Sequence, residues 1–184
     1  LAASQHPVSM HQVMALGMRL FGRGHYGLVM PSVLAGTATV PLVYLLGRRL
    51  AGRSVGFVAA GLLAVGYTHI HFSRTLFGPI ATLCLTLALL LLVTGLESGA
   101  PLAFALSGAA LALGMFAYDS ARIGPVLFAV LALWQALFDR EGFKRSWRGW
   151  ALLGGTAVVV FGPKIAFLVT DFQSFAGRGS EVAI

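Results

Sequence analysis

Charge is scarce in this chain of 184 residues: Asp, Glu, Lys and Arg together make up 10% of it, and only six residues are acidic. Soluble domains carry about 25% charged residues, so the chain lacks the polar surface that a globule in water requires. The hydrophobic fraction is 58% and the mean hydropathy is +0.85. This composition predicts an all-α, polytopic transmembrane helix bundle.

Cysteine is equally scarce, because Cys84 is the single one and lies inside an apolar run. It cannot form an internal disulfide, and we interpret it as inert packing. The chain also has no P-loop, no His-Glu-x-x-His zinc motif, no Cys-x-x-Cys pair and no nucleophile elbow. These absences argue against several enzyme classes. We predict no cofactor, no metal site and, among the few acids, no catalytic base.

Long apolar runs dominate what remains, and a spanning helix needs about 20 such residues. We expect six spans, at Tyr26–Gly47, Val55–Phe72, Pro79–Leu96, Pro101–Tyr118, Ile123–Phe138 and Trp150–Val169. The chain then divides into the end of an extracytoplasmic loop (1–25), a six-span membrane domain (26–169) and the start of an extracytoplasmic segment (170–184). In residues 10–21, apolar side chains recur at helical spacing, which predicts an interfacial amphipathic helix. The alternative is the tail of an earlier span.

The basic residues are distributed unevenly between the connections. The net charge is +7, yet the arginines lie between apolar runs and not along one stripe, which favours membrane lipids over nucleic acid as partner. Two of the connections that share one side hold most of the positive charge, in Arg48, Arg49, Arg53, Arg140, Lys144, Arg145 and Arg148. The positive-inside rule predicts that this side is cytoplasmic. Arg74 and Arg122 are then extracytoplasmic.

Two polar clusters ending in arginine, Tyr67–Arg74 and Tyr118–Arg122, each follow an apolar run. The Arg74 guanidinium could bind a phosphate in bidentate fashion, or it could only anchor a helix end among headgroups. His69 and His71 are two residues apart, so on a helix they diverge and cannot chelate one metal. Hydrogen bonds to a headgroup or sugar suit His69 better.

Three further residues are candidates for the same face. Asp119 and Arg122 are spaced to pair across a helical turn, either as a structural pair or in catalysis. Tyr118 is either part of a substrate site or an aromatic of the membrane interface. Lys164 is the only charge inside a predicted span. It either reaches outward to the interface or faces an internal polar cavity, and we favour the cavity.

The run from Met30 to Leu50, with its Pro-Ser start and its Tyr-Leu-Leu-Gly-Arg-Arg end, resembles a stretch of the C-type membrane glycosyltransferases. The closest group is the superfamily of protein O-mannosyltransferases and aminoarabinose transferases. Three short motifs are similar to that family as well: His6-Pro7, His69-x-x-Phe-Ser-Arg74 and Tyr118-x-Ser-Ala-Arg122. The last of these, and the segment 171–178, resemble the bacterial members.

The resemblance implies a GT-C-like fold in a multi-pass protein of the bacterial cytoplasmic membrane. Such enzymes transfer a sugar from a polyprenyl-phosphate donor to a hydroxyl of a protein, lipid or glycan acceptor outside the membrane. The resemblance implies donor handling by Arg74, with His69 and Arg122, and places His6 at the end of an outer loop. The family's catalytic carboxylate lies in a loop that would precede Leu1, so we expect the chain to be a piece of a longer enzyme. Met30 stands where the family usually has arginine.

Two other functional classes compete with this interpretation. Part of a secondary transporter, or of a lipid-handling protein without catalysis, would place polar or broken-helix features near mid-membrane. A non-catalytic membrane scaffold would direct Arg74 and Arg122 toward lipid and not toward each other. Polar residues gathered at one face favour the enzyme, provided that both clusters lie at the same end of the bundle.

Overall fold

The computed structural model describes residues 8–75 and 78–170, and within these ranges the chain forms helices and no strands. The predicted all-α membrane-type bundle is therefore confirmed. The elements in chain order are α1 (Val8–Phe21), α2 (His25–Ala51), α3 (Arg53–Val65), α4 (Tyr67–Ser73), α5 (Pro79–Ser98), α6 (Pro101–Ala117), the 3₁₀ turn η1 (Asp119–Arg122), α7 (Ile123–Phe138) and α8 (Arg140–Thr170).

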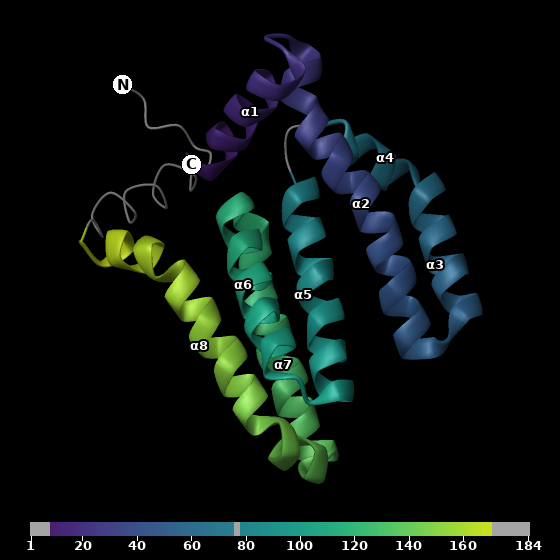
Figure 1. The fold of residues 1–184 in the computed structure, drawn as a ribbon, viewed down its shortest axis with the longest axis vertical. Coiled ribbons are helices and arrows are strands. Elements are labelled where there is room, and N and C mark those ends of the chain that lie inside the picture. Colours follow the sequence, from purple (N-terminus) through teal and green to yellow (C-terminus); the bar gives the residue numbers. More distant parts are fainter. Residues whose placement is uncertain (1–7, 76–77, 171–184) are drawn as a thin grey trace, which may run out of the picture.

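The long helices run up and down the bundle in alternation (Figure 1). Helix α5 packs between α2 and α6, and α6 packs in turn on α8. One end of the bundle carries α1, α4, η1 and the start of α5, and we call it the α4 end (Figure 1). The opposite end carries the α2–α3, α5–α6 and α7–α8 connections, and we call it the Arg49 end.

Two described helices, α2 with 27 residues and α5 with 20, are long and apolar enough to cross a membrane. The pair α3 and α4 counts as a third if a bent pair is one span. Helices α6 and α7 are apolar but shorter, with 17 and 16 residues. The length test thus supports fewer complete spans than the six predicted runs.

The predicted span Val55–Phe72 is wrong as a single straight helix. It is broken at Gly66, and α4 turns away from α3 by 60°. Gly66 adopts an extended backbone with φ −64° and ψ 119°, which ends α3. Glycine is a weak helix former, because it loses more backbone freedom than other residues. The bend directs α4 across the bundle.

The predicted polar connection between the last two spans is also wrong. Only Asp139 separates α7 from α8, and α8 is a continuous helix of 31 residues. The carboxylate Oδ1 of Asp139 accepts the backbone N–H of Gly142 at 3.0 Å. An N-terminal cap of this kind satisfies one of the first free amides of a helix, so helix starts well before the apolar run.

Small residues hold the core together. Ser107 is fully buried, and its hydroxyl donates to the carbonyl oxygen of Ala88 at 2.7 Å, joining α6 to α5. Gly108 lies against the Leu153 carbonyl of α8, and Gly114 lies against Cys84 of α5. Close approach over glycine gives membrane helices the packing contacts that hydrophobicity alone does not supply. Gly108 and Gly114 thus bring α6 close to α8 and to α5.

Candidate functional site

Helix α4 lies across α2 because the two helices touch at a glycine. The Gly36 backbone faces Ser73, and no room for a Cβ atom remains between them. The Nε2 atom of His69 lies 3.2 Å from the carbonyl oxygen of Gly36, while the Ser73 hydroxyl donates to the His69 carbonyl at 2.7 Å. One ring nitrogen of His69 therefore has a partner within the protein. A role of the other nitrogen toward a headgroup or sugar stays a prediction.

Arg74 follows directly on α4 and is exposed. Its backbone N–H donates to the carbonyl of His71 at 3.1 Å, which closes the helix and leaves the side chain to extend from its end. In the described part of the chain the Arg74 guanidinium has no carboxylate partner. Beside it, the rings of Tyr67 and His71 stack at 5.8 Å, and Tyr67 is 80% exposed. An aromatic and cationic rim of this kind suits the headgroup region of a bilayer.

The second cluster forms the corner between α6 and α7. Tyr118 ends α6 in an extended conformation, and its carbonyl accepts the N–H of Ala121 at 3.1 Å. Arg122 immediately precedes α7, as its N-cap residue, and is exposed. The η1 turn packs on α5, α6 and α7. Asp119 and Arg122 are the first and last residues of the η1 turn, and an ion pair between their side chains remains a prediction.

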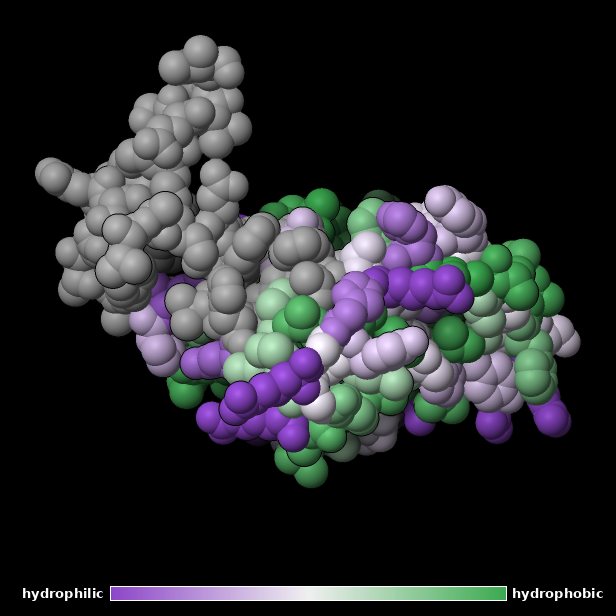
Figure 2. Space-filling model, turned by 90° about the horizontal axis from the view of Figure 1, so that it is seen from above, coloured by the Kyte–Doolittle hydropathy of each residue, from purple (hydrophilic) through white to green (hydrophobic). Residues whose placement is uncertain are grey.

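The two clusters lie at the same end of the bundle but on different helices (Figure 1). Helix α4 packs on α2 and α3, whereas η1 packs on α5, α6 and α7. Helix α5 lies next to both regions, because it packs on α2, which carries α4, and also contacts η1. Figure 2 views the molecule from the α4 end and shows hydrophilic residues spread over this face among hydrophobic ones. The condition set by the sequence, both clusters at one end, is met.

Lys164 is half-buried near the same end, on α8. Its ammonium nitrogen lies 5.8 Å from the ring centre of Phe116 and 5.6 Å from that of Phe161, and the two rings are 5.2 Å apart. A cation within about 6 Å of a ring face is attracted by the ring quadrupole. Two aromatic rings therefore flank this charge. Whether it faces an internal polar cavity stays a prediction.

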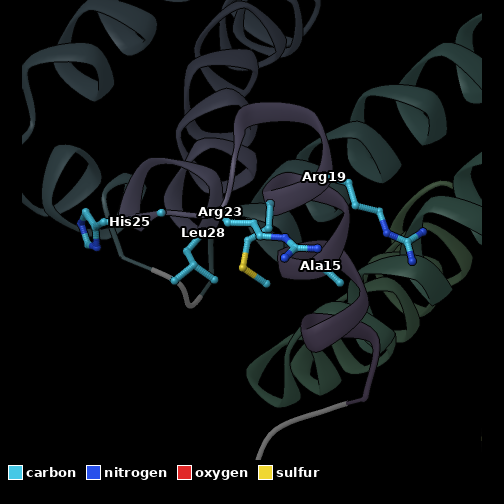
Figure 3. Close-up of a pocket in the computed structure, with 7 residues that line it drawn as sticks. Ala15, Arg19, Arg23, His25 and Leu28 are labelled. Carbon is cyan, nitrogen blue, oxygen red and sulfur yellow. The ribbon is translucent and has the colours of Figure 1, made fainter.

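The structure adds a feature that the sequence interpretation missed, a basic pocket at the elbow between α1 and α2. It has a volume of about 610 Å³ and is lined by Ala15, Met18, Arg19, Arg23, Gly24, His25 and Leu28. We call it the elbow pocket. In Figure 3 the Arg23 side chain extends over α1 toward the side on which Arg19 lies, while the His25 ring lies on the opposite side. Two guanidinium groups beside an apolar floor suit an anionic headgroup.

The elbow depends on glycines. Gly22 has a φ of +95°, a conformation that side-chain-bearing residues rarely adopt, and Gly27 packs on the Gly22 carbonyl so closely that a Cβ would not fit. The spacing Gly-x-Gly-x-x-Gly over residues 22–27 was the available signal. That spacing indicates phosphate binding when it follows a strand. Here it follows helix α1, so the spacing alone does not predict a binding site.

His6 lies outside the described residues. Among the residues that the structure does describe, no group of three or more His, Cys, Asp or Glu side chains could hold a metal ion. The expectation of no cofactor stays a prediction.

Comparison with known families decides the class. The family model of the dolichyl-phosphate-mannose-protein mannosyltransferases matches residues 5–167. The chain belongs to this family. Comparison with curated proteins and with solved structures finds no match.

Membership in the mannosyltransferase family agrees with the bundle of apolar helices. It supports a membrane glycosyltransferase of the GT-C type with mannosyltransferase-type chemistry. The matched region includes both arginine-terminated clusters, the elbow pocket and Lys164. It also includes the strongly basic Arg49 end, to which the family resemblance assigns no role in the site.

Proposed function

We propose that this mannosyltransferase-family chain holds the phosphate of a polyprenyl-phosphate sugar donor at its α4 end, on the extracytoplasmic face of a bacterial cytoplasmic membrane. The observation that carries the proposal is the gathering of cations at one end of a bundle in this family. Arg74, Arg122 and Lys164 belong to that end, and the elbow pocket adds Arg19 and Arg23 (Figures 1 and 3). The opposite end is the more basic one, which supports this orientation.

The reaction assigns these cations a definite task. The acceptor hydroxyl oxygen bonds to the anomeric carbon of the sugar as the bond from that carbon to the phosphate oxygen breaks. The leaving polyprenyl phosphate takes the electron pair and gains negative charge, which a guanidinium stabilises as it develops. A general base takes the acceptor proton. We assign that role to no residue of this chain.

A transporter remains the second candidate and is less well supported. Its binding features should lie near mid-membrane, at broken helices. One broken helix exists here, at Gly66, but the bend leads into α4 and Arg74 at the end of the bundle. The charged candidates lie at that end as well. This arrangement favours a headgroup site over a central translocation site.

The decisive experiment measures sugar transfer by the full-length protein that contains this chain, reconstituted with a polyprenyl-phosphate mannose donor. We expect Arg74→Ala to lower kcat/KM about 10- to 100-fold, the range for losing a hydrogen bond to a charged group. Arg74→Lys should recover part of this loss, since lysine keeps the charge but loses the bidentate geometry. Arg53→Ala, at the Arg49 end, is the matched control and should retain activity. Unchanged donor affinity and turnover in Arg74→Ala would disprove the phosphate role.

A further inference from the structure

A cavity of about 930 Å³ lies at the Arg49 end, opposite the proposed donor site. It is bounded by α2, α5, α6, α7 and α8, and we call it the Arg145 pocket. Its inner wall is apolar, with Leu46, Leu89, Val93, Phe104, Leu131 and Trp134 among the lining residues. Arg145 and Arg148 also line it. Apolar walls with cationic groups beside them match an amphipathic anion.

The acidic residues of this pocket already have partners. Glu97 forms an ion pair with Arg49 of α2, and Asp139 caps α8 through the N–H of Gly142. The polar groups on the inner wall are occupied too, because the Trp150 indole N–H donates to the Gln135 side-chain oxygen at 2.8 Å. The pocket therefore offers a bound molecule few free acceptors.

The two arginines of the pocket differ from its acidic residues in their surroundings. Arg145 and Arg148 are three residues apart on α8, so they share one face of the helix. Both are exposed, and within the described ranges neither has a carboxylate partner. The Arg148 guanidinium carbon lies 5.7 Å from the ring centre of Trp147, which limits where that side chain points. Two guanidinium groups on one face can bind one phosphate from two directions.

Arg145 and Arg148 belong to a group of neighbouring cations on α8. Arg145 lies in the second turn and Arg148 in the third turn of a helix that starts at Arg140, and Lys144 adds a further positive charge beside them. Like charges three or four residues apart on a helix repel each other. Asp139 and Glu141 offset part of this, but Glu141 also pairs with Lys144 at 3.3 Å. A bound phosphate would relieve the remaining repulsion.

We propose that the Arg145 pocket binds one anionic phospholipid, with its phosphate between Arg145 and Arg148 and an acyl chain along the apolar wall. The pocket opens at the end predicted to face the cytoplasm, where anionic lipids attract basic residues. It is separate from the proposed donor site at the α4 end. The lipid would tie the α7–α8 corner to α5 and α2, and so fix the helices on which the α4 end is built.

Tryptophan quenching tests this proposal directly in the reconstituted protein. Trp134 and Trp150 line the pocket and account for two of the three tryptophans of the chain. The protein is placed in nanodiscs of phosphatidylcholine with a minor fraction of phosphatidylglycerol, and either lipid carries brominated acyl chains. We expect brominated phosphatidylglycerol to quench out of proportion to its share of the lipid. Each arginine should raise its affinity for the pocket, relative to phosphatidylcholine, by about fivefold. Quenching in proportion to the lipid share would overturn the proposal.

Matched double variants separate the pocket from the general positive charge of this end. Arg145→Gln/Arg148→Gln should abolish the preference for phosphatidylglycerol. Arg48→Gln/Arg53→Gln removes the same charge at the same end from residues that do not line the pocket, and it should keep the preference. Equal loss in both variants would mean attraction by surface potential alone, and would refute a defined site.

Two further arms keep the test decisive. Val93→Phe narrows the apolar wall, leaves every charge in place and adds no tryptophan, so it should also abolish the preference even if the arginine double variant folds poorly. Inorganic phosphate is then added at millimolar concentration against chloride of equal ionic strength. Displacement of the brominated lipid by phosphate would show a site for a soluble phosphate and overturn the lipid proposal. Persistence of quenching supports it.

Discussion

The imidazole of His69 lies with Nε2 3.2 Å from the carbonyl oxygen of Gly36, and this contact fixes where α4 crosses α2. Ser73, one turn further along α4, packs on the same glycine. Arg74 is the next residue, so its position is set by a contact made without any ligand. A helix held in this way presents the guanidinium at a defined place, and less ordering is needed when a phosphate binds.

Substitution of Gly36 should displace α4. Gly36→Val introduces atoms where Ser73 already lies, and overpacking of this kind costs about 1–3 kcal/mol. Gly61→Val is the control, because a Cβ atom at Gly61 meets nothing within 4 Å. Thermal unfolding in detergent should show a lower Tm for Gly36→Val alone. An equal Tm for both variants would mean that α4 does not pack on α2 as described.

Gly108 should be the most sensitive glycine between α6 and α8. A side chain there meets the backbone carbonyl of Leu153, which cannot move without shifting α8. We expect Gly108→Ala to destabilise the bundle by about 1–3 kcal/mol. Gly155→Ala, where nothing lies within 4 Å, should be neutral or slightly stabilising. Chemical unfolding of the two variants, followed by helical circular dichroism, measures the difference.

Most of the helices could be predicted from hydropathy, because each apolar run has nearly the length of a span. The two errors have different causes. The break at Gly66 depends on the contact of α4 with Gly36, which is far away in the sequence. The early start of α8 depends on one cap by Asp139, while the mostly polar stretch that follows reads as a loop in a hydropathy profile. Neither the break nor the early helix start changes the hydropathy of an apolar run, so a hydropathy profile does not reveal them.

The sequence predicted only those cations of the candidate site that directly follow or interrupt an apolar run. Arg74 and Arg122 follow apolar runs and were therefore conspicuous. Arg19 and Arg23 stand in a mixed segment, and a turn at Gly22 is needed to bring them to one pocket. The turn is visible in the sequence only as a glycine spacing, and nothing in that spacing says which side chains will converge.

The buried hydroxyl of Ser107 should contribute measurably to the core. It donates to the Ala88 carbonyl at 2.7 Å and is fully buried. Ser107→Ala should lower the free energy of unfolding by about 0.5–1.5 kcal/mol, the usual net value of one hydrogen bond. Ser54→Ala, at an exposed position of α3, is the control. If Ser107→Ala is as stable as the parent, the bond between α5 and α6 contributes nothing.

The elbow pocket yields the prediction that most directly extends the proposed donor site. Arg19→Gln/Arg23→Gln removes both guanidinium groups beside the pocket without shortening α1 or disturbing the turn at Gly22. If the pocket takes the donor phosphate before transfer, the interaction exists in the ground state as well, so KM should rise about 10- to 100-fold with little change in kcat. Arg48→Gln/Arg53→Gln removes equal charge at the Arg49 end from residues that do not line the Arg145 pocket, and its KM for the donor should stay near that of the parent enzyme. A rise in KM for both variants would assign the effect to net charge. A fall in kcat at constant KM would instead place the two arginines at the leaving phosphate in the transition state.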